Sequence, residues 1–379
     1  MRFFWLTATA LAASLALSAC GDSAPDVPKQ QSLKIAVAAP ITGKDAAFGS
    51  QLRNGAIQAI EDLNAAGGIL GQQISLSVED DNGDPKQGVS IANKVAGEGV
   101  KLLIGHFNSG VSIPASDVYH ENGILMISPG STNPALTDRG LWNVFRVCGR
   151  DDQQGTVAGQ YIAQNLADRK IAIVHDKTTY GKGLADETKK AINEAGITEV
   201  LYEGINSGEK DFSALISKLK EAEAQLVYFG GVHTEAGLIA RQMRDQGLDA
   251  TLMGGDGIAT DEFAAIAGPA AEGTLMTFAP DPRKRPEAAE APKAFEAKGI
   301  TPEAYTLYAY AVAQILKQAA EAANSLDPKA LAEQLRSGQN FDTVIGTIAF
   351  NEKGDVNRLD YTMYTWRKVD GDRISYVEN

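Results

Sequence analysis

The sequence predicts an α/β protein with two similar lobes, each built around a parallel sheet. From residue 33 onward, short apolar segments alternate with amphipathic segments of helical length. This alternation is typical of parallel sheets that carry helices on both faces. It runs to about residue 149 and then restarts, and 379 residues is about the length that two ordinary domains require.

The first block begins with LKIAVAAP (33–40), an apolar run that predicts a buried strand. Helical spacing of apolar residues follows over 49–64, and Gly67–Gly68 predicts the end of that helix. Asp84–Pro85 predicts the start of the second helix, with an acidic cap and a proline in the first turn. Further strands are expected at 73–80, 100–106 and 124–130, with a third helix to about residue 122.

The second block follows NVFRVCG (143–149) and repeats the pattern. Strands are expected at 170–176, 200–205, 224–231, 250–255 and 272–279. Helices are expected at about 152–165, 181–195 and 212–222, and another ends at Gly247.

The rest of the chain is too short to bury a third core. It contains a charged, alanine-rich segment (283–298), two expected helices (302–323 and 328–336) and strand-like segments at 346–350, 361–369 and after the turn at Asp370–Asp372. We therefore expect these pieces to complete the two lobes, so that the chain crosses between them more than once.

Composition excludes several classes of protein. The 35 basic and 48 acidic residues give a net charge of -13, which argues against binding of nucleic acid. Two cysteines, Cys20 and Cys148, exclude a disulfide framework and a cysteine-rich zinc site. The four histidines are scattered without metal-ligand spacing, and common hydrolase, nucleotide and metalloprotease motifs are missing. We expect neither an enzyme nor a cofactor.

The first twenty residues predict an export signal. An apolar stretch from about residue 3 to 17 is shorter than the ~20 residues that a membrane span needs. It ends in Leu17-Ser18-Ala19-Cys20, which resembles the lipobox of bacterial lipoproteins, in which the cysteine is acylated. A plain signal peptide and a short membrane anchor are the alternatives. Residues 21–32 have no apolar periodicity and contain two prolines, which indicates a flexible tether.

Small hydroxyl residues follow two of the expected strands. Asn108 and Ser109 come after 100–106, and Ser131 and Thr132 come after 124–130. Ligands of open α/β sheets bind at the carboxyl ends of the strands, and hydroxyl and N–H groups at a helix N-terminus bind a carboxylate. The alternative is that these residues only cap helices.

Other candidates lie in the second block. Asp256 follows the strand at 250–255, where its carboxylate could receive an ammonium group or cap a turn. Tyr180 lies at the end of another strand. Phe48 could line a pocket or belong to the core.

Eight segments carry a resemblance that extends in order over nearly the whole chain after the tether. They are LNAAGGILG (63–71), DPKQGVSIANKV (84–95), 102–134, IAIVHDKTTYGKGLA (171–185), GEKDFSALISKLK (208–220), VYFGG (227–231), MGGDG (253–257) and FNEKGD (350–355). In these segments the chain resembles the bacterial leucine/isoleucine/valine-binding proteins, the receptors of branched-chain amino acid ABC transporters.

The resemblance implies a type I periplasmic-binding-protein fold, with two lobes joined by three crossovers that close over ligand. It implies that Ser109 and Thr132 bind the carboxylate, that the Gly130 carbonyl and Asp256 accept from the ammonium, and that Tyr180 contacts the ligand from the other lobe. The remaining pocket positions that it implies are Phe48, Asn108, Ser131, Val232 and Tyr305.

Three positions depart from the family pattern. Val232 stands where a tyrosine is frequent, and Asp256 replaces a glutamate that is one methylene longer. Gly83 and Asn108 occupy the positions of a disulfide found in some relatives. No spare buried charge is evident for a charged ligand side chain, so an aliphatic side chain is favoured.

The two resemblances, to the lipobox and to this family, therefore imply a monomeric lipoprotein in the periplasm or on the outer face of the cell membrane. It would deliver a small aliphatic amino acid to an ABC permease and ATPase. Expected boundaries are 1–19 for the signal, 20–32 for the tether, 33–149 with 281–357 for the N-terminal lobe, and 150–280 with 358–379 for the C-terminal lobe. A ligand sensor, a binder of short-chain amides, urea or γ-amino acids, and an exported hydrolase are the alternatives.

Overall fold

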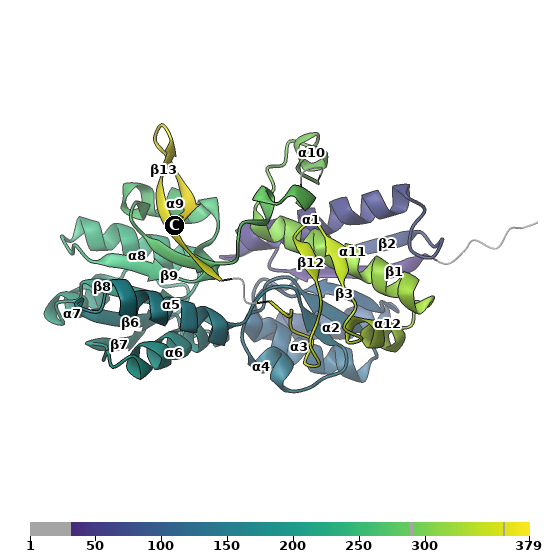
Figure 1. Ribbon diagram of the computed structural model, residues 1–379, viewed down its shortest axis with the longest axis horizontal. Helices are drawn as coiled ribbons and strands as arrows, with labels where there is room; N and C mark the ends of the chain where they lie inside the picture. Colours follow the sequence, from purple (N-terminus) through teal and green to yellow (C-terminus); the bar gives the residue numbers. More distant parts are fainter. Residues whose placement is uncertain (1–31, 289–290, 359–360) are drawn as a thin grey trace, which may run out of the picture. The chain divides into compact units, whose positions relative to one another are not determined.

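The computed structural model describes residues 32–288, 291–358 and 361–379. The predicted signal segment, Cys20 and nearly all of the predicted tether lie outside the described residues. Within the described residues the strands form a five-stranded sheet, a seven-stranded sheet and a two-stranded hairpin. In Figure 1 most helices and strands fall into two groups, one around each large sheet. We call these groups the first lobe and the second lobe.

The five-stranded sheet of the first lobe is parallel throughout, with the order β2-β1-β3-β4-β5. Its elements alternate as the sequence predicts. They are β1 (Leu33–Ala39), α1 (Ala46–Ala65), β2 (Ile74–Asp80), α2 (Pro85–Gly97), β3 (Leu102–Gly105), α3 (Ser109–Glu121), β4 (Leu125–Ser128), α4 (Ala135–Asp138) and β5 (Val144–Arg146).

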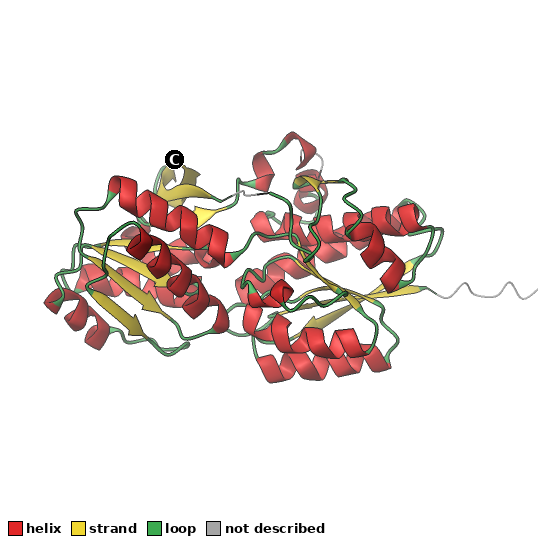
Figure 2. Cartoon of the chain, turned by 60° about the horizontal axis from the view of Figure 1, so that its bottom comes forward, coloured by secondary structure: helices red, strands yellow, loops and turns green. Residues whose placement is uncertain are grey.

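Both faces of the sheet are buried at its inner strands, which explains why β1, β3 and β4 are nearly continuous apolar runs. Alternate strand residues face opposite sides. Ile35 and Val37 pack in the cluster that includes α1 and α11 (Ala304–Ala323), whereas Ala36 and Ala38 pack with α2 and α3. Figure 2 shows helices on both sides of each large sheet.

The second lobe has the strand order β14-β13-β10-β9-β8-β6-β7. Its first part alternates in the same way. The elements are α5 (Asp151–Asn165), β6 (Ile171–His175), α6 (Thr179–Glu194), β7 (Leu201–Gly204), α7 (Ser213–Glu221), β8 (Leu226–Gly230), α8 (His233–Asp245), β9 (Thr251–Gly254), η1 (Asp256–Ile258), α9 (Asp261–Ala267), η2 (Gly268–Ala271) and β10 (Leu275–Phe278).

The last two strands differ from a purely parallel sheet. β13 (Thr362–Asp370) pairs antiparallel with β10, and β14 (Arg373–Glu378) pairs antiparallel with β13. The short turn at Gly371–Asp372 accounts for the direction of β14 relative to β13, because two strands joined by a tight turn must run antiparallel. Gly371 adopts a φ of 58°, which suits such a hairpin turn.

The remaining elements return to the first lobe. The charged segment forms η3 (Pro282–Lys284), η4 (Pro286–Ala288) and α10 (Ala291–Glu296), which were not predicted. α11 packs on α1 and β3, and α12 (Pro328–Leu335) packs on α11. β11 (Phe341–Thr343), also not predicted, pairs with β12 (Gly346–Ile348). Within the described residues the chain thus passes between the lobes after β5, after β10 and before β13.

Candidate functional site

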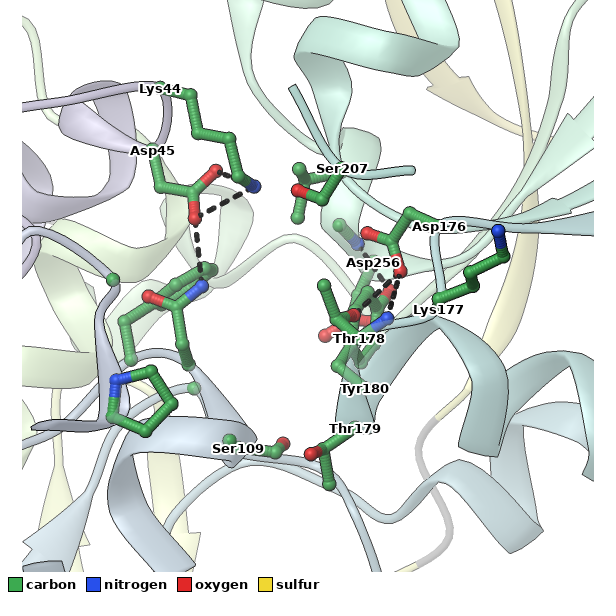
Figure 3. A pocket seen from close by; sticks show the side chains of 18 residues that line it. Lys44, Asp45, Ser109, Asp176, Lys177, Thr178, Thr179, Tyr180, Ser207 and Asp256 are labelled. Atoms are coloured by element: carbon green, nitrogen blue, oxygen red, sulfur yellow. Dashed lines mark hydrogen bonds and ion pairs between the residues drawn. The ribbon is translucent and has the colours of Figure 1, made fainter. Parts of the chain in front are cut away.

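A cavity of about 260 Å³ opens at the carboxyl ends of strands from both lobes. Parallel strands bring the loops that follow them to one edge of a sheet, and here two such edges face each other. Figure 3 draws the side chains that line the cavity and labels ten of the residues. The lining residues of the first lobe are Lys44, Asp45, Gly83, Pro85, Phe107, Asn108, Ser109, Gly110 and Gly130, and those of the second are Asp176, Lys177, Thr178, Thr179, Tyr180, Ser207, Val232, Asp256 and Gly257.

The first-lobe wall contains the N-terminus of α3. Ser109 is the first residue of this helix, and its Oγ accepts from the Asn133 backbone N–H at 3.3 Å. Asn108 donates from Nδ2 to Asp45 at 2.8 Å, and its buried Oδ1 has no hydrogen-bond partner. The free N–H groups and the dipole of a helix N-terminus favour a negatively charged ligand group at this wall.

The loop after β4 supports that wall. The Ser131 hydroxyl donates to the Phe107 carbonyl at 2.8 Å and lies 2.6 Å from the Ser112 hydroxyl, so it holds the loop rather than lining the cavity. Thr132 is fully buried, and its Oγ1 has no hydrogen-bond partner. At Gly130 any Cβ would lie 2.5 Å from the Phe107 ring, so the glycine allows that ring to reach the cavity.

Aromatic rings form the apolar part of the wall. Phe107 lines the cavity and stacks on Phe48 with ring centroids 4.4 Å apart. Phe48 itself is fully buried behind Phe107 and meets Tyr305 edge to face at 5.6 Å. Val232, the N-cap residue of α8, adds an aliphatic contact from the second lobe.

Asp256 is the acid of the second-lobe wall. Tyr180 donates its hydroxyl to Asp256 Oδ1 at 2.7 Å, and Tyr305 donates to Oδ2 at 2.6 Å. Burial raises the pKa of Asp256, and the two tyrosine hydroxyls oppose that rise. Since α11, which carries Tyr305, packs on the first lobe, this carboxylate is held from both lobes.

Tyr180 lies within α6 rather than in the loop where the sequence places it. The helix begins at Thr179 because the Thr178 side chain caps it, accepting from the Gly181 N–H at 2.9 Å. The Tyr180 hydroxyl also accepts from the Gly257 N–H at 2.9 Å and thereby orders the loop that carries Asp256.

The sequence did not indicate that the Asp176 side chain lines this cleft. The expectation that the site has no spare buried charge is therefore wrong. Asp176 follows β6 and is 1% exposed. Its Oδ1 accepts from the Thr178 N–H and hydroxyl at 2.9 and 2.6 Å, whereas Oδ2 has no hydrogen-bond partner. Across the cavity Lys44 pairs with Asp45 at 3.0 Å (Figure 3). Only the position of Asp176 after a strand could have signalled it.

The cavity thus has a helix N-terminus with a hydroxyl on one side, a carboxylate on the other, and apolar groups between them. This arrangement suits a small dipolar ligand with an apolar part. Within the described residues no cluster of His, Cys, Asp or Glu side chains could hold a metal ion, and no helix is long and apolar enough to span a membrane. Cys148 is buried and unpaired, and burial raises the pKa of its thiol.

Two α/β lobes with a polar-ended cleft between them define a ligand-binding protein. The family model described as periplasmic binding protein matches residues 32–372, and the chain belongs to this family. It is 58% identical over 344 residues to Leu/Ile/Val-binding protein homolog 1 of Brucella melitensis, covering 91% of this chain and 93% of the relative.

Two solved structures are similar to the chain in fold and over most of its length. The leucine-binding protein LivK of Thermotoga maritima is 29% identical, with a TM-score of 0.83 and coverage of 91% of this chain and 97% of that one. The branched-chain amino acid transporter substrate-binding protein LivJ of Streptococcus pneumoniae, solved with isoleucine, is 25% identical. Its TM-score is 0.80, with coverage of 92% of this chain and 100% of that one.

Proposed function

We propose that this protein is the substrate-binding component of an ABC importer and that it binds a branched-chain amino acid in the inter-lobe cavity. The observation that carries the proposal is the Asp256 carboxylate facing the N-terminus of α3 across a cavity walled by Phe107 and Val232. In this proposal Ser109 and Thr132 bind the ligand carboxylate. The Gly130 carbonyl joins Asp256 at the ammonium, and the site binds its ligand without catalysing a reaction.

The relatives support this choice of ligand. Proteins that share the fold carry names for leucine or leucine/isoleucine/valine binding, and one was solved with isoleucine. The apolar wall formed by Phe107 and Val232 suits such a side chain. Closure follows from contacts that only a ligand touching both lobes can make, because those contacts stabilise the closed state selectively.

The location and the lobe boundaries belong to the same proposal. Cys20 would carry a lipid that anchors the body to a membrane through the tether 20–32, after removal of 1–19 as a signal peptide. The N-terminal lobe would comprise 33–149 and 281–357, and the C-terminal lobe 150–280 and 358–379. The protein would act as a monomer with a permease and an ATPase as its partners.

Thermal shift against the twenty amino acids tests the ligand class. Leucine, isoleucine or valine should raise the melting temperature, since a ligand at 100 times its Kd stabilises the native state by about 2.7 kcal/mol. γ-Aminobutyrate, acetamide and urea are included because the fold could accommodate them. If these smaller ligands alone raise the melting temperature, the branched-chain proposal is wrong.

Asp256→Asn tests the site itself. The amide keeps the size of the side chain but removes the charge that faces the ammonium, so we expect leucine binding to weaken by about 1.5–3 kcal/mol, or ten- to hundredfold. Isothermal titration calorimetry measures the loss. Asp261→Asn, an exposed position in α9, is the matched control and should bind as the wild type does. Equal affinities of the two variants would remove Asp256 from the site.

A further inference from the structure

The cavity has a second polar end, away from the wall proposed to bind the ligand carboxylate. Lys44 and Ser207 lie at this end, across the opening from Ser109 (Figure 3). Asn108 lines the cavity from the first lobe and Asp176 from the second. The side chain of leucine, isoleucine or valine has no polar atom that could bond to these groups. The polar end therefore has no hydrogen-bonding role in the binding of a branched-chain amino acid.

Asp176 presents an acceptor oxygen that lacks a donor. Its Oδ1 is held by the N–H and hydroxyl of Thr178, whereas its Oδ2 is buried without a hydrogen-bond partner among the described residues. Any Cβ at Gly231 would lie 3.1 Å from Oδ2, so the glycine leaves this oxygen uncovered. Burial raises the pKa of Asp176 to about 6, and most of the carboxyl is therefore ionised at pH 7. A buried, ionised oxygen without a donor is costly, which points to a donor on the ligand.

Asn108 adds a second acceptor and Lys44 a donor. Asn108 Nδ2 donates to Asp45 at 2.8 Å, and this bond fixes the orientation of the amide because a carboxylate only accepts. Asn108 Oδ1 is buried and has no partner in the described part of the chain. Lys44 donates to the two oxygens of Asp45 at 3.0 and 3.2 Å, which leaves the third N–H of its ammonium for another acceptor.

The charges at this end favour a neutral ligand group. The Lys44 ammonium would repel a cationic side chain, and the carboxylates of Asp45 and Asp176 would repel an anionic one. A primary carboxamide is neutral and carries two N–H donors and one carbonyl acceptor. It matches two acceptors and one donor, whereas a hydroxyl supplies a single donor.

We propose that the site also binds amino acids whose side chain ends in a primary carboxamide, with the amide N–H groups donating to Asp176 and Asn108 and the carbonyl accepting from Lys44. Glutamine and asparagine are the two amino acids of this class. The inference rests on the proposed function, because the α-ammonium and α-carboxylate occupy the positions proposed for those of leucine. It extends the ligand class from aliphatic side chains to neutral polar ones.

Calorimetry on the whole protein with leucine, asparagine, glutamine, aspartate and glutamate tests the ligand class. Asparagine has nearly the shape of leucine, and glutamine is one methylene longer, so the pair shows which length reaches the polar end. We expect at least one carboxamide to bind with a Kd within tenfold of that of leucine. Aspartate and glutamate should bind at least a hundredfold more weakly, because a carboxylate replaces the amide and faces Asp176.

Asp176→Asn tests the acceptor. The amide nitrogen that replaces Oδ2 cannot accept, while Oδ1 still accepts from Thr178 and keeps the helix cap. The ratio of carboxamide affinity to leucine affinity should fall at least tenfold. Asp249→Asn is the matched control, because the Asp249 side chain is fully exposed, and its ratio should stay within twofold of the wild type.

Lys44→Met tests the donor independently of the Asp176 variant and of its folding. Methionine keeps the length of the side chain and removes the ammonium, so the same affinity ratio should fall at least threefold. Lys182→Met, at an exposed position of α6, is its control and should keep the wild-type ratio.

The outcomes separate this inference from the proposed function. A wild type that binds leucine but neither carboxamide overturns the inference, as does a wild-type ratio in Asp176→Asn or, if that variant does not fold, in Lys44→Met. A wild type that binds a carboxamide but none of the branched-chain amino acids supports the polar end and refutes the branched-chain proposal. A wild type that binds no amino acid refutes both.

Discussion

Asp176 shows the effect of burying a charged side chain in the wall of the cleft. Burial raises its pKa from 3.8 to about 6, with a further rise from Glu235, while Thr178 and Lys44 oppose the change. A carboxyl whose pKa is raised by folding is more costly to ionise in the folded protein than in the unfolded chain. The folded protein is therefore more stable at low pH, where this carboxyl is protonated in both the folded and the unfolded state. That stability is lost as the pH rises from about 4 through about 6.

The variant Asp176→Asn should remove this pH dependence. Linkage converts a pKa raised from 3.8 to about 6 into about 3 kcal/mol. We therefore expect the free energy of unfolding of the wild type to fall by about this amount relative to the variant between pH 4 and pH 7. Urea unfolding at each pH measures the difference.

The control for this experiment is Asp249→Asn, because the Asp249 side chain is fully exposed. The difference in free energy of unfolding between Asp249→Asn and the wild type should stay nearly constant over the same pH range. A constant difference for Asp176→Asn as well would contradict the raised pKa. The amide retains Oδ1, which can still accept from Thr178, so the helix cap is preserved in the comparison.

At single residues, the sequence singled out some positions after strands and missed others whose role depends on burial. Ser109, Val232 and Asp256 line the cavity, because the ends of parallel strands meet at one edge. Asp176 also follows a strand and Asp151 begins a helix, but neither position in the sequence shows that the carboxylate is buried. Their missing hydrogen-bond partners result from tertiary packing, which residue order does not reveal.

At the scale of elements, a buried side-chain network joins two loops of the first-lobe wall. His106 Nδ1 lies 2.6 Å from Asp81 Oδ2, and His106 Nε2 lies 2.8 Å from the Tyr119 hydroxyl; all three residues are fully buried. Asp81 Oδ1 also accepts from the Gly83 N–H at 2.9 Å. The network therefore positions the loop after β2 and the loop that carries Phe107 to Ser109.

Tyr119→Phe should weaken both the fold and the site. It leaves His106 Nε2 buried without a partner, which costs about 1–3 kcal/mol of unfolding free energy. Because His106 belongs to the loop that carries Ser109, we also expect weaker leucine binding. Urea unfolding and calorimetry measure the two effects separately.

Tyr310→Phe is the matched control for Tyr119→Phe. The Tyr310 hydroxyl donates to Asp62 at 2.7 Å, but both residues lie outside the cavity lining. The control should lose stability and keep its affinity for leucine. If Tyr119→Phe also keeps its affinity, the network contributes to folding without positioning the site.

Helix ends were the best predicted feature of the elements, because they depend on local chemistry. Gly67 and Gly68 end α1 with positive φ values of 100° and 83°, and Asp84 caps α2 by accepting from Lys86 and Gln87. By contrast, the pairing of β13 with β10 joins residues far apart in the sequence. Its antiparallel direction could not be predicted from the alternating pattern alone.

At the scale of the whole molecule, three passages of the chain and a few side-chain contacts connect the lobes. Tyr305 reaches Asp256, Asn133 donates to the Thr179 carbonyl at 2.9 Å, and Thr234 donates to the Lys44 carbonyl at 3.1 Å. The first two contacts involve groups at or beside the ligand site. The third joins the start of α8 to the loop before α1, and it can be removed without changing the proposed ammonium and carboxylate positions.

Thr234→Val tests whether this third contact contributes to closure. Valine keeps the shape of threonine and removes the hydroxyl that donates to Lys44. A hydrogen bond contributes about 0.5–1.5 kcal/mol net, so we expect leucine to bind two- to tenfold more weakly. Small-angle X-ray scattering over a leucine titration should give the same radius of gyration at saturation and a higher midpoint concentration. Ser217→Ala, which removes a hydroxyl bonded within α7, should leave the midpoint unchanged. An unchanged midpoint for Thr234→Val would show that closure depends on the ligand-site contacts and not on this bridge.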